Sequence, residues 1–364
     1  MIKVEAPGKL MFSGEWSVLE IGNPAIVLAL DRKVKAVIDK SREIVLDAPE
    51  FGIKNVKAEF DGAQLKVAGL SAEQEKEIVF LKKSVEVALR FLKEKKVKIR
   101  HFRISTYSGE MQKEKVKVGF GSSAALCVAA VFGVARFHGK KLKPLEVFKL
   151  ATLAHFFAQG KIGSGFDVAA SAFGGVVWYK RFDPKFLEDA ATKSIGWFVK
   201  EKWPGLEIKK ITFPKKLKFL VAFSGKKADT RELVGRINKF KAREKDVYLY
   251  IINSISEVTK QLFLALKKGN EKSILKLLQE NRLLLRQLGE ESKTGLESRE
   301  LAEIIETTES FGAAAKFCGA GGGDSAIAVS FDGKKLEALK KALNKKGFSI
   351  INAGISTSGV KAYA

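Results

Sequence analysis

The sequence predicts an α+β protein of two domains. Its 364 residues are 46% hydrophobic and 29% charged, which is enough apolar material for two cores in a water-exposed chain. Strand-forming residues dominate the first 53 positions, whereas apolar residues at three- and four-residue spacing dominate between positions 247 and 311. A turn at Trp203-Pro204-Gly205 marks entry into the second part. We expect domains over residues 1–195 and 196–364.

Elements of the first domain follow from apolar spacing and from Gly, Pro and Ser breaks. After the strands that end near Ile53, we expect two long helices over residues 73–95 and 144–159, strands over 97–105 and 175–181, and a buried helix from 122. The second domain is expected to hold helices over 247–266, 273–288, 298–311 and 334–345, strands over 218–223, 325–331 and 348–351, and a strand-like tail over 355–363. This mixture suits a ferredoxin-like α+β half. Residues 224–231 are expected to form a mobile loop.

A glycine-rich loop precedes the most apolar helix signal of the chain. Residues 118–126 read VGFGSSAAL. Gly119 and Gly121 allow positive φ angles and the close approach of an anion. The amides of residues 122–125 are expected to be unpaired donors at the helix start, where the dipole adds about half a positive charge. The loop therefore predicts a phosphate site.

Two other interpretations of this loop are open at this point. Residues 119–124 also fit the G-x-G-x-x-A dinucleotide fingerprint, which requires a buried strand before it and an acidic residue about 20 positions later. Residues 112–118 alternate like a half-exposed strand instead, and the later position falls in the basic segment Gly139-Lys140-Lys141. No G-x-x-x-x-G-K-[ST] motif occurs. The loop could also be a serine-capped turn without a ligand.

Two further segments strengthen the phosphate interpretation. Residues 6–16, APGKLMFSGEW, place Lys9 directly after a Pro-Gly turn between two apolar runs. Residues 316–324, KFCGAGGGD, form a second glycine loop before a strand-like run. Ordering five mostly glycine residues costs about 1 kcal/mol or more for each. A bound ligand or a partner segment is expected to offset that cost.

In this order, the three segments resemble the three motifs of the GHMP kinases, the family of galactokinase, homoserine kinase, mevalonate kinase and phosphomevalonate kinase. The matching residues are 7–15, 119–125 and 316–324, so the resemblance spans almost the whole chain. It implies an N-terminal mixed β/α domain of ribosomal-protein-like fold that binds ATP, and a ferredoxin-like C-terminal domain. Within the family, residues 154–170 and 178–182 are most similar to phosphomevalonate kinases.

The acceptor is expected to carry a phosphate already. Mevalonate kinases have a proline in the segment H-G-x-P-S-G-x-D, whereas this chain lacks the proline and has Lys161 six residues before Asp167. An added ammonium suits a phosphorylated acceptor, although Lys161 could also be one of many surface lysines. The expected reaction converts 5-phosphomevalonate and ATP to mevalonate 5-diphosphate and ADP. Mevalonate kinase and mevalonate diphosphate decarboxylase on the same fold are the alternatives.

The resemblance implies a role for each matching residue. Asp167 receives or orients the acceptor proton, and Lys9 keeps Asp167 ionised and neutralises charge on the transferred group. Ser123 ligates Mg²⁺, and the loop over residues 319–323 closes over the phosphates and the acceptor. The expected ATP contacts are Gly119, Gly121, Ser122, Ser123, Ala124 and Ala125. The expected acceptor contacts are Gln159, Lys161, Ser164, Gly321 and Gly322.

The chain departs from the family pattern at two positions. Mevalonate kinases carry a magnesium-binding glutamate 11 residues before the catalytic aspartate, and Phe156 stands there in this chain. Magnesium is then expected to be held by ATP oxygens, Ser123 and water. Cys318 replaces the usual Ser or Thr of the third motif, and we expect this small thiol to fill space rather than to act as a nucleophile.

Composition bounds the partners. No apolar run reaches membrane-spanning length, the first residues lack signal-peptide character, and two cysteines indicate a reducing compartment, so we expect a cytoplasmic protein without a membrane partner. The net charge of +24 is spread over single lysines and short pairs, which favours a solubilising surface. A nucleic-acid role is an alternative supported by charge alone. The three histidines are too scattered for a dedicated metal site, although His155 lies near the active segment. A monomer or a homodimer is expected.

Overall fold

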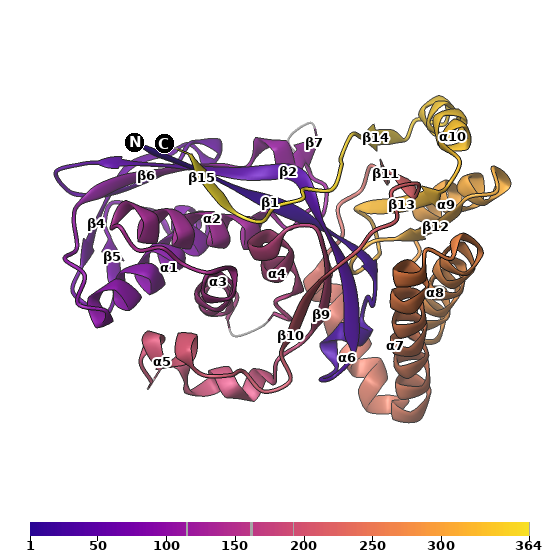
Figure 1. Ribbon diagram of the computed structural model, residues 1–364, viewed down its shortest axis with the longest axis horizontal. Coiled ribbons are helices and arrows are strands. Elements are labelled where there is room, and N and C mark those ends of the chain that lie inside the picture. Colours follow the sequence, from indigo (N-terminus) through magenta and orange to yellow (C-terminus); the bar gives the residue numbers. More distant parts are fainter. Residues whose placement is uncertain (114–115, 161–162, 192, 364) are drawn as a thin grey trace.

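The computed structural model describes residues 1–113, 116–160, 163–191 and 193–363. The chain forms two lobes, each built on its own sheet (Figure 1). Both chain ends lie beside each other in the larger lobe, because the last strand pairs with the first. The expected two-domain α+β class is confirmed.

Nine strands form the larger sheet: β1 (Ile2–Ser13), β2 (Pro24–Lys40), β3 (Ile44–Ala48), β4 (Ile53–Phe60), β5 (Leu65–Val67), β6 (Phe102–Tyr107), β9 (Val176–Lys180), β10 (Glu207–Ile211) and β15 (Lys361–Tyr363). The main path runs β10-β9-β2-β6-β3-β4-β5, and β1 pairs with β2 and β15. Only the pairing of β3 with β6 is parallel among these strands, so the sheet is mixed.

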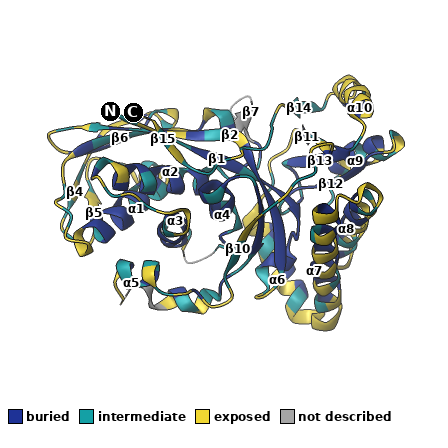
Figure 2. Ribbon diagram, viewed as in Figure 1, coloured by how far each residue is buried: buried dark blue, intermediate teal, exposed yellow. Residues whose placement is uncertain are grey.

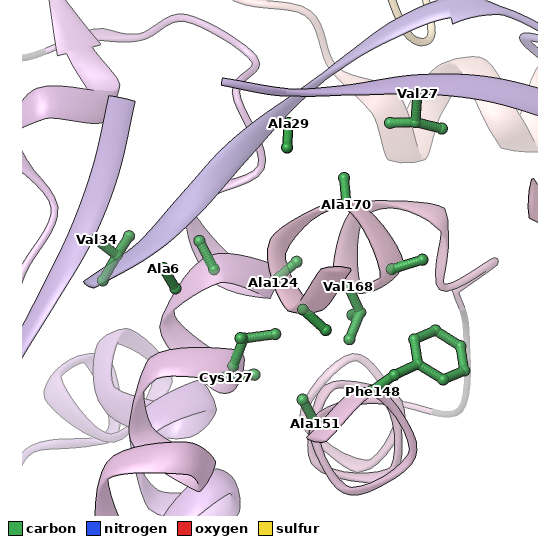
Figure 3. Close-up of a cluster of buried hydrophobic side chains, with 14 of the residues drawn as sticks. Ala6, Val27, Ala29, Val34, Ala124, Cys127, Phe148, Ala151, Val168 and Ala170 are labelled. Carbon is green, nitrogen blue, oxygen red and sulfur yellow. The ribbon is translucent and has the colours of Figure 1, made fainter. Parts of the chain in front are cut away.

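Helices cover one face of this sheet (Figure 1): α1 (Ala72–Glu94), α2 (Ser122–Phe137), α3 (Pro144–Ala158) and α4 (Phe166–Phe173), with α5 (Ile195–Lys200) against α1 and α3. Small side chains let them approach closely. Ala29 of β2, Ala124 of α2, Ala151 of α3 and Ala170 of α4 are fully buried in one cluster (Figure 3). Such close packing leaves little freedom for the helix starts that face the cavity described below.

The smaller sheet is antiparallel and has four strands in the order β12-β13-β11-β14. Its strands are β11 (Lys218–Phe223), β12 (Ala314–Phe317), β13 (Ser325–Ser330) and β14 (Ser349–Ile351). The helices are α6 (Thr230–Arg243), α7 (Lys245–Lys268), α8 (Glu271–Glu291), α9 (Arg299–Ser310) and α10 (Gly333–Lys345). This strand order is that of a ferredoxin-like split βαβ unit, with α6 to α9 in place of the first helix. The outer faces of α7, α8 and α10 are exposed (Figure 2).

Several sequence expectations differ from the structure. The prediction of a Pro-Gly turn before Lys9 is wrong. Strand β1 continues through Pro7 and Gly8 with a register shift between them, and such a bulge accommodates a proline within a sheet. The strand expected from Val97 begins only at Phe102, because the chain first turns away from α1 through Lys96, which has a φ of 56°. The mobile loop expected over residues 224–231 overlaps α6, whose first turn Asp229 caps.

Other strands differ from the sequence expectations in their extent or in their place in a sheet. Residues 112–118, expected as one strand, contain the short strands β7 (Gln112–Lys113) and β8 (Val116–Lys117), which pair with each other, and residues 114–115 lie outside the described parts. Strand β10 extends the larger sheet beyond residue 195, and β15 returns to it. We therefore propose the domain boundary between residues 195 and 196 without direct support from the sheets. No helix in the described ranges is long and apolar enough to cross a membrane.

Candidate active site

Residues from all three motif segments line one cavity of about 610 Å³. Its wall includes Lys9 from β1, residues 119–121 from the glycine loop and 122–123 from the first turn of α2, Asp167 from α4, and residues 318–320 from the loop after β12. Further lining residues come from α6 and α7 of the smaller lobe. Segments more than 300 residues apart in the sequence therefore meet in one concave site.

The bulge in β1 directs Lys9 onto the glycine loop. The Lys9 amide donates to the carbonyl of Phe120 at 2.9 Å, and its ammonium donates to the carbonyl of Gly119 at 2.7 Å. The aliphatic part of the side chain covers Gly121, where an added Cβ would lie 2.9 Å from Lys9 Cγ. Gly121 is thus a glycine both for its φ of 74° and for this contact. Lys9 and the glycine loop form one unit.

The start of α2 has the uncapped geometry that the predicted phosphate site requires. Gly121 is the N-cap residue and no side chain caps the helix, so the first-turn amides lack an intrahelical acceptor. One part of the expectation is wrong: the amide of Ala125 donates to the carbonyl of Gly121 at 3.1 Å and is not free. Ala124 and Ala125 are fully buried and do not line the cavity, whereas Ser122 and Ser123 do.

Asp167 lies in the first turn of α4 and faces the same cavity. Its Oδ1 accepts a hydrogen bond from the amide of Val168 at 2.9 Å. Within the described ranges, no ion pair joins Asp167 to Lys9, whose ammonium instead lies 5.7 Å from the ring centre of Phe166. The expected effect of Lys9 on the ionisation of Asp167 would therefore act across the cavity and not through an ion pair. Both charged side chains line the cavity, and the ring near the Lys9 ammonium belongs to Phe166, the residue before Asp167 in α4.

His155 contacts the first turn of α2 and feels the charge of Asp167, a role that the sequence did not reveal. Its Nε2 lies 3.3 Å from the hydroxyl of Ser123, and its ring packs on Phe80 at 5.2 Å. Burial lowers the pKa of His155, and the Asp167 charge opposes that shift. The neighbouring Phe156 packs on Phe157 and offers no oxygen. His155 holds the serine that is expected to ligate magnesium.

The second glycine loop, which belongs to the smaller lobe, covers one side of the site. Gly319 and Ala320 line the cavity. Gly321 and Gly322, the expected acceptor contacts, do not: the amide of Gly322 donates to the carbonyl of Leu296 at 2.6 Å, and a Cβ on Gly321 would lie 2.4 Å from that carbonyl oxygen. Both glycines serve packing within the smaller lobe. The geometry gives no support to acceptor contacts from them.

A buried ion pair ties the first motif to the third. Lys316 donates to Glu15 Oε1 and, at 2.8 Å, to the carbonyl of Phe317, and both charged side chains are fully buried. Two neighbouring polar atoms, Glu15 Oε2 and Trp16 Nε1, have no hydrogen-bond partner in the described parts although both residues line the cavity. Burial raises the pKa of the Cys318 thiol to about 12, which fits the expected packing role.

A second group of cations lines the cavity. Arg181 donates to the carbonyls of Leu19 and Gly163 at 2.7 and 3.2 Å, and its buried Nε has no partner among the described residues. Near it, Glu20 accepts hydrogen bonds from Lys241 at 2.5 Å and Tyr248 at 2.8 Å, and these contacts lower the pKa of Glu20 against its burial. The sequence did not predict this group: Arg181 lies in the segment 178–182 that resembles phosphomevalonate kinases but was given no role, and Lys241 lies in no motif.

Gln159, Lys161 and Ser164 are the remaining expected acceptor contacts. Gln159 and Ser164 line the cavity, and the carbonyl of Ser164 accepts a hydrogen bond from Tyr179. Lys161 lies outside the described residues. The parts of the chain that the structure describes contain no group of three or more His, Cys, Asp or Glu residues that could hold a metal ion. A metal in this site fits only together with a nucleotide, whose phosphates would supply the other oxygens.

Replacing Gly121 with alanine is expected to lower kcat about 10²-fold, because a Cβ there displaces Lys9 from the glycine loop. Gly139→Ala is the matched control: Gly139 has a φ of 79°, close to that of Gly121, but nothing lies within 4 Å of its added Cβ. Both variants should lose about 1–2 kcal/mol of stability from backbone strain. Steady-state kinetics and denaturant unfolding measure the two effects, and equal kcat values would contradict the Lys9 contact.

Comparisons with known proteins agree with this geometry. The GHMP kinases N terminal domain matches residues 81–175, and the GHMP kinases C terminal domain matches residues 262–349. The chain is 31% identical to a phosphomevalonate kinase of Streptomyces sp. (strain CL190), over 89% of this chain and 88% of that protein. It is 27% identical to a mevalonate kinase of Thermococcus sibiricus, over 99% and 98%. A solved Lin0012 protein of Listeria innocua is 30% identical, covers 100% and 99%, and superposes with a TM-score of 0.92. This chain belongs to the GHMP kinase family.

Proposed function

We propose that this GHMP kinase transfers the γ-phosphoryl group of ATP to 5-phosphomevalonate and releases mevalonate 5-diphosphate and ADP. The relatives include both phosphomevalonate and mevalonate kinases, so the proposal depends on the cavity. The observation that carries it is the presence of two groups of cations in that cavity. Lys9 and Lys227 belong to the first, and Arg181 and Lys241 to the second.

The two groups match an acceptor with an anion at each end. Lys9 contacts the glycine loop, and Lys227 acts electrostatically on Asp324, which covers that loop. Arg181 and Lys241 meet at Glu20, from opposite lobes. The phosphate of 5-phosphomevalonate suits the first group, where transfer takes place, and its carboxylate suits the second. Mevalonate has a hydroxyl in place of that phosphate and would leave the first group with less charge to bind.

The chain's own residues then act mainly by position and charge. The amides of Ser122 and Ser123 hold the ATP phosphates at the start of α2. Lys9 neutralises charge on the group in transfer, and Asp167 orients the attacking acceptor oxygen or takes its proton. Glu15 Oε2 and Trp16 Nε1, which have no partner among the described residues, can bind the middle of the acceptor. Magnesium would be held by Ser123 and ATP oxygens, and it would neutralise phosphate charge.

The test is to incubate the purified protein with Mg-ATP and, separately, mevalonate, 5-phosphomevalonate and mevalonate diphosphate, while following ADP and carbon dioxide. We expect ADP with 5-phosphomevalonate alone and no carbon dioxide. ADP with mevalonate alone would make the protein a mevalonate kinase. Carbon dioxide from the diphosphate would make it a decarboxylase. No turnover with any of the three, together with salt-dependent binding to random RNA, would favour a nucleic-acid role.

A further inference from the structure

Asp324 brings a carboxylate from the smaller lobe onto the glycine loop of the larger lobe. A Cβ added to Gly119 would lie 2.8 Å from Asp324 Oδ2. Next to it, the hydroxyl of Ser325 donates to the carbonyl of Val118 at 3.1 Å. Only glycine at position 119 admits the Asp324 side chain, so the close approach is built into both loops.

The backbone around Asp324 is fixed by three hydrogen bonds. Its amide donates to the carbonyl of Lys226 at 2.7 Å, and its carbonyl accepts from the amide of Ser224 at 2.8 Å. Its Oδ1 accepts from the amide of Ala228 at 3.2 Å. The residue adopts a φ of 56°, which is uncommon for a side chain larger than glycine. The remaining polar atom of Asp324, Oδ2, has no hydrogen-bond partner among the described residues.

This free oxygen lies where phosphates are expected to bind. Asp324 lines the cavity together with the glycine loop. Burial raises the pKa of Asp324, and the charges of Lys9 and Lys227 act in the opposite direction. The ammonium of Lys9 is already bound to Gly119 and makes no ion pair with Asp324 in the described ranges. A carboxylate beside bound phosphates is repelled unless a cation lies between them.

We propose that Asp324 is a ligand of the magnesium ion that accompanies ATP. Mg²⁺ takes oxygen ligands and is typically held by one or two carboxylates together with substrate phosphates, which is the environment of Asp324 Oδ2. The proposal rests on the proposed use of Mg-ATP and is independent of the acceptor. Because Asp324 belongs to the smaller lobe and Ser123 to the larger, the metal–nucleotide complex would bridge the two lobes.

The test measures metal binding directly, with Mn²⁺ as the probe in electron paramagnetic resonance and AMP-PNP as a non-hydrolysable nucleotide. Asp324→Asn keeps an oxygen for the Ala228 amide and removes the charge. Its affinity for Mn²⁺ in the presence of AMP-PNP is expected to fall about tenfold or more. Its affinity for metal-free AMP-PNP in EDTA is expected to stay equal or to rise. Asp324→Gly, which suits the φ of 56°, should behave in the same way.

Asp229→Asn is the matched control. Asp229 caps α6 by accepting hydrogen bonds from the amides of Arg231 and Glu232, and asparagine caps equally well. This variant should keep both affinities. Unchanged Mn²⁺ affinity in Asp324→Asn with tighter metal-free binding would overturn the proposal, because Asp324 would then only repel phosphate. An equal loss of both affinities would also overturn it, because Asp324 would then only position the loop. Failure of the unmodified protein to bind AMP-PNP would instead contradict the proposed function.

Discussion

Asp167→Asn is expected to lower kcat about 10²–10⁴-fold while leaving ATP affinity nearly unchanged. The carboxylate lines the cavity from the first turn of α4, whereas the amides proposed to hold the nucleotide belong to α2. Asparagine retains an oxygen for the Val168 amide, so α4 should start in the same place. Steady-state kinetics with 5-phosphomevalonate and calorimetric titration with AMP-PNP measure the two quantities.

Asp332→Asn is the matched control for this prediction. Asp332 caps α10 by accepting a hydrogen bond from the amide of Lys334 at 2.9 Å, and it lies outside the cavity lining. This exchange should leave kcat unchanged. Near-normal kcat in Asp167→Asn would remove Asp167 from the mechanism.

The pH dependence separates two roles for Asp167. A phosphate monoester loses its second proton at a pKa of about 6, so well above that pH a base has no proton left to remove from the acceptor. If Asp167 acts as a base, the deficit of Asp167→Asn shrinks as the pH rises through that range. If Asp167 orients the acceptor through its hydrogen bonds, the deficit stays constant. Rates measured on both sides of pH 6 distinguish the two roles.

Lys316→Met is expected to destabilise the protein by about 3–5 kcal/mol, because it leaves Glu15 buried without its ion-pair partner. The double variant Glu15→Gln/Lys316→Met should recover most of that loss, since replacing both charges removes the unpaired one. The midpoint of denaturant unfolding measures both effects. A loss below about 1 kcal/mol in the single variant would contradict a strongly coupled pair.

Lys226→Met provides the control for charge removal at the surface. Lys226 pairs with Glu300, but 64% of its side chain is exposed, so the expected change is only about 0–1 kcal/mol.

The double variant Glu15→Gln/Lys316→Met also tests whether Glu15 binds the acceptor. If it regains stability but keeps a raised KM for 5-phosphomevalonate with an unchanged KM for ATP, Glu15 has a binding role beyond folding. Full recovery of both would leave the pair a structural role alone.

Local sequence signals predicted elements well where the periodicity was strong. The strand over residues 218–223 and the long helices of both lobes are confirmed, because their apolar spacing and caps lie within a few consecutive residues. Helix α6 was missed although the chain carries its signals: Asp229 as the N-cap residue and buried Leu233, Ile237 and Phe240 at three- and four-residue spacing. The bulge at Pro7 could not be predicted, because a register shift depends on the partner strand β2.

The sequence by itself determined the α+β class, the three glycine-rich or lysine-bearing motifs and the uncapped start of α2 after Gly121, since each depends on neighbouring residues. Tertiary structure alone decided which side chains face the cavity. Gly321 and Gly322 pack against the backbone of Leu296 and do not line the cavity. Arg181 and Lys241 lie near Glu20, although they belong to different lobes. Glu15 and Lys316 are 301 positions apart. Contacts between residues so far apart cannot be predicted from local sequence patterns, because they form only when the two lobes pack together.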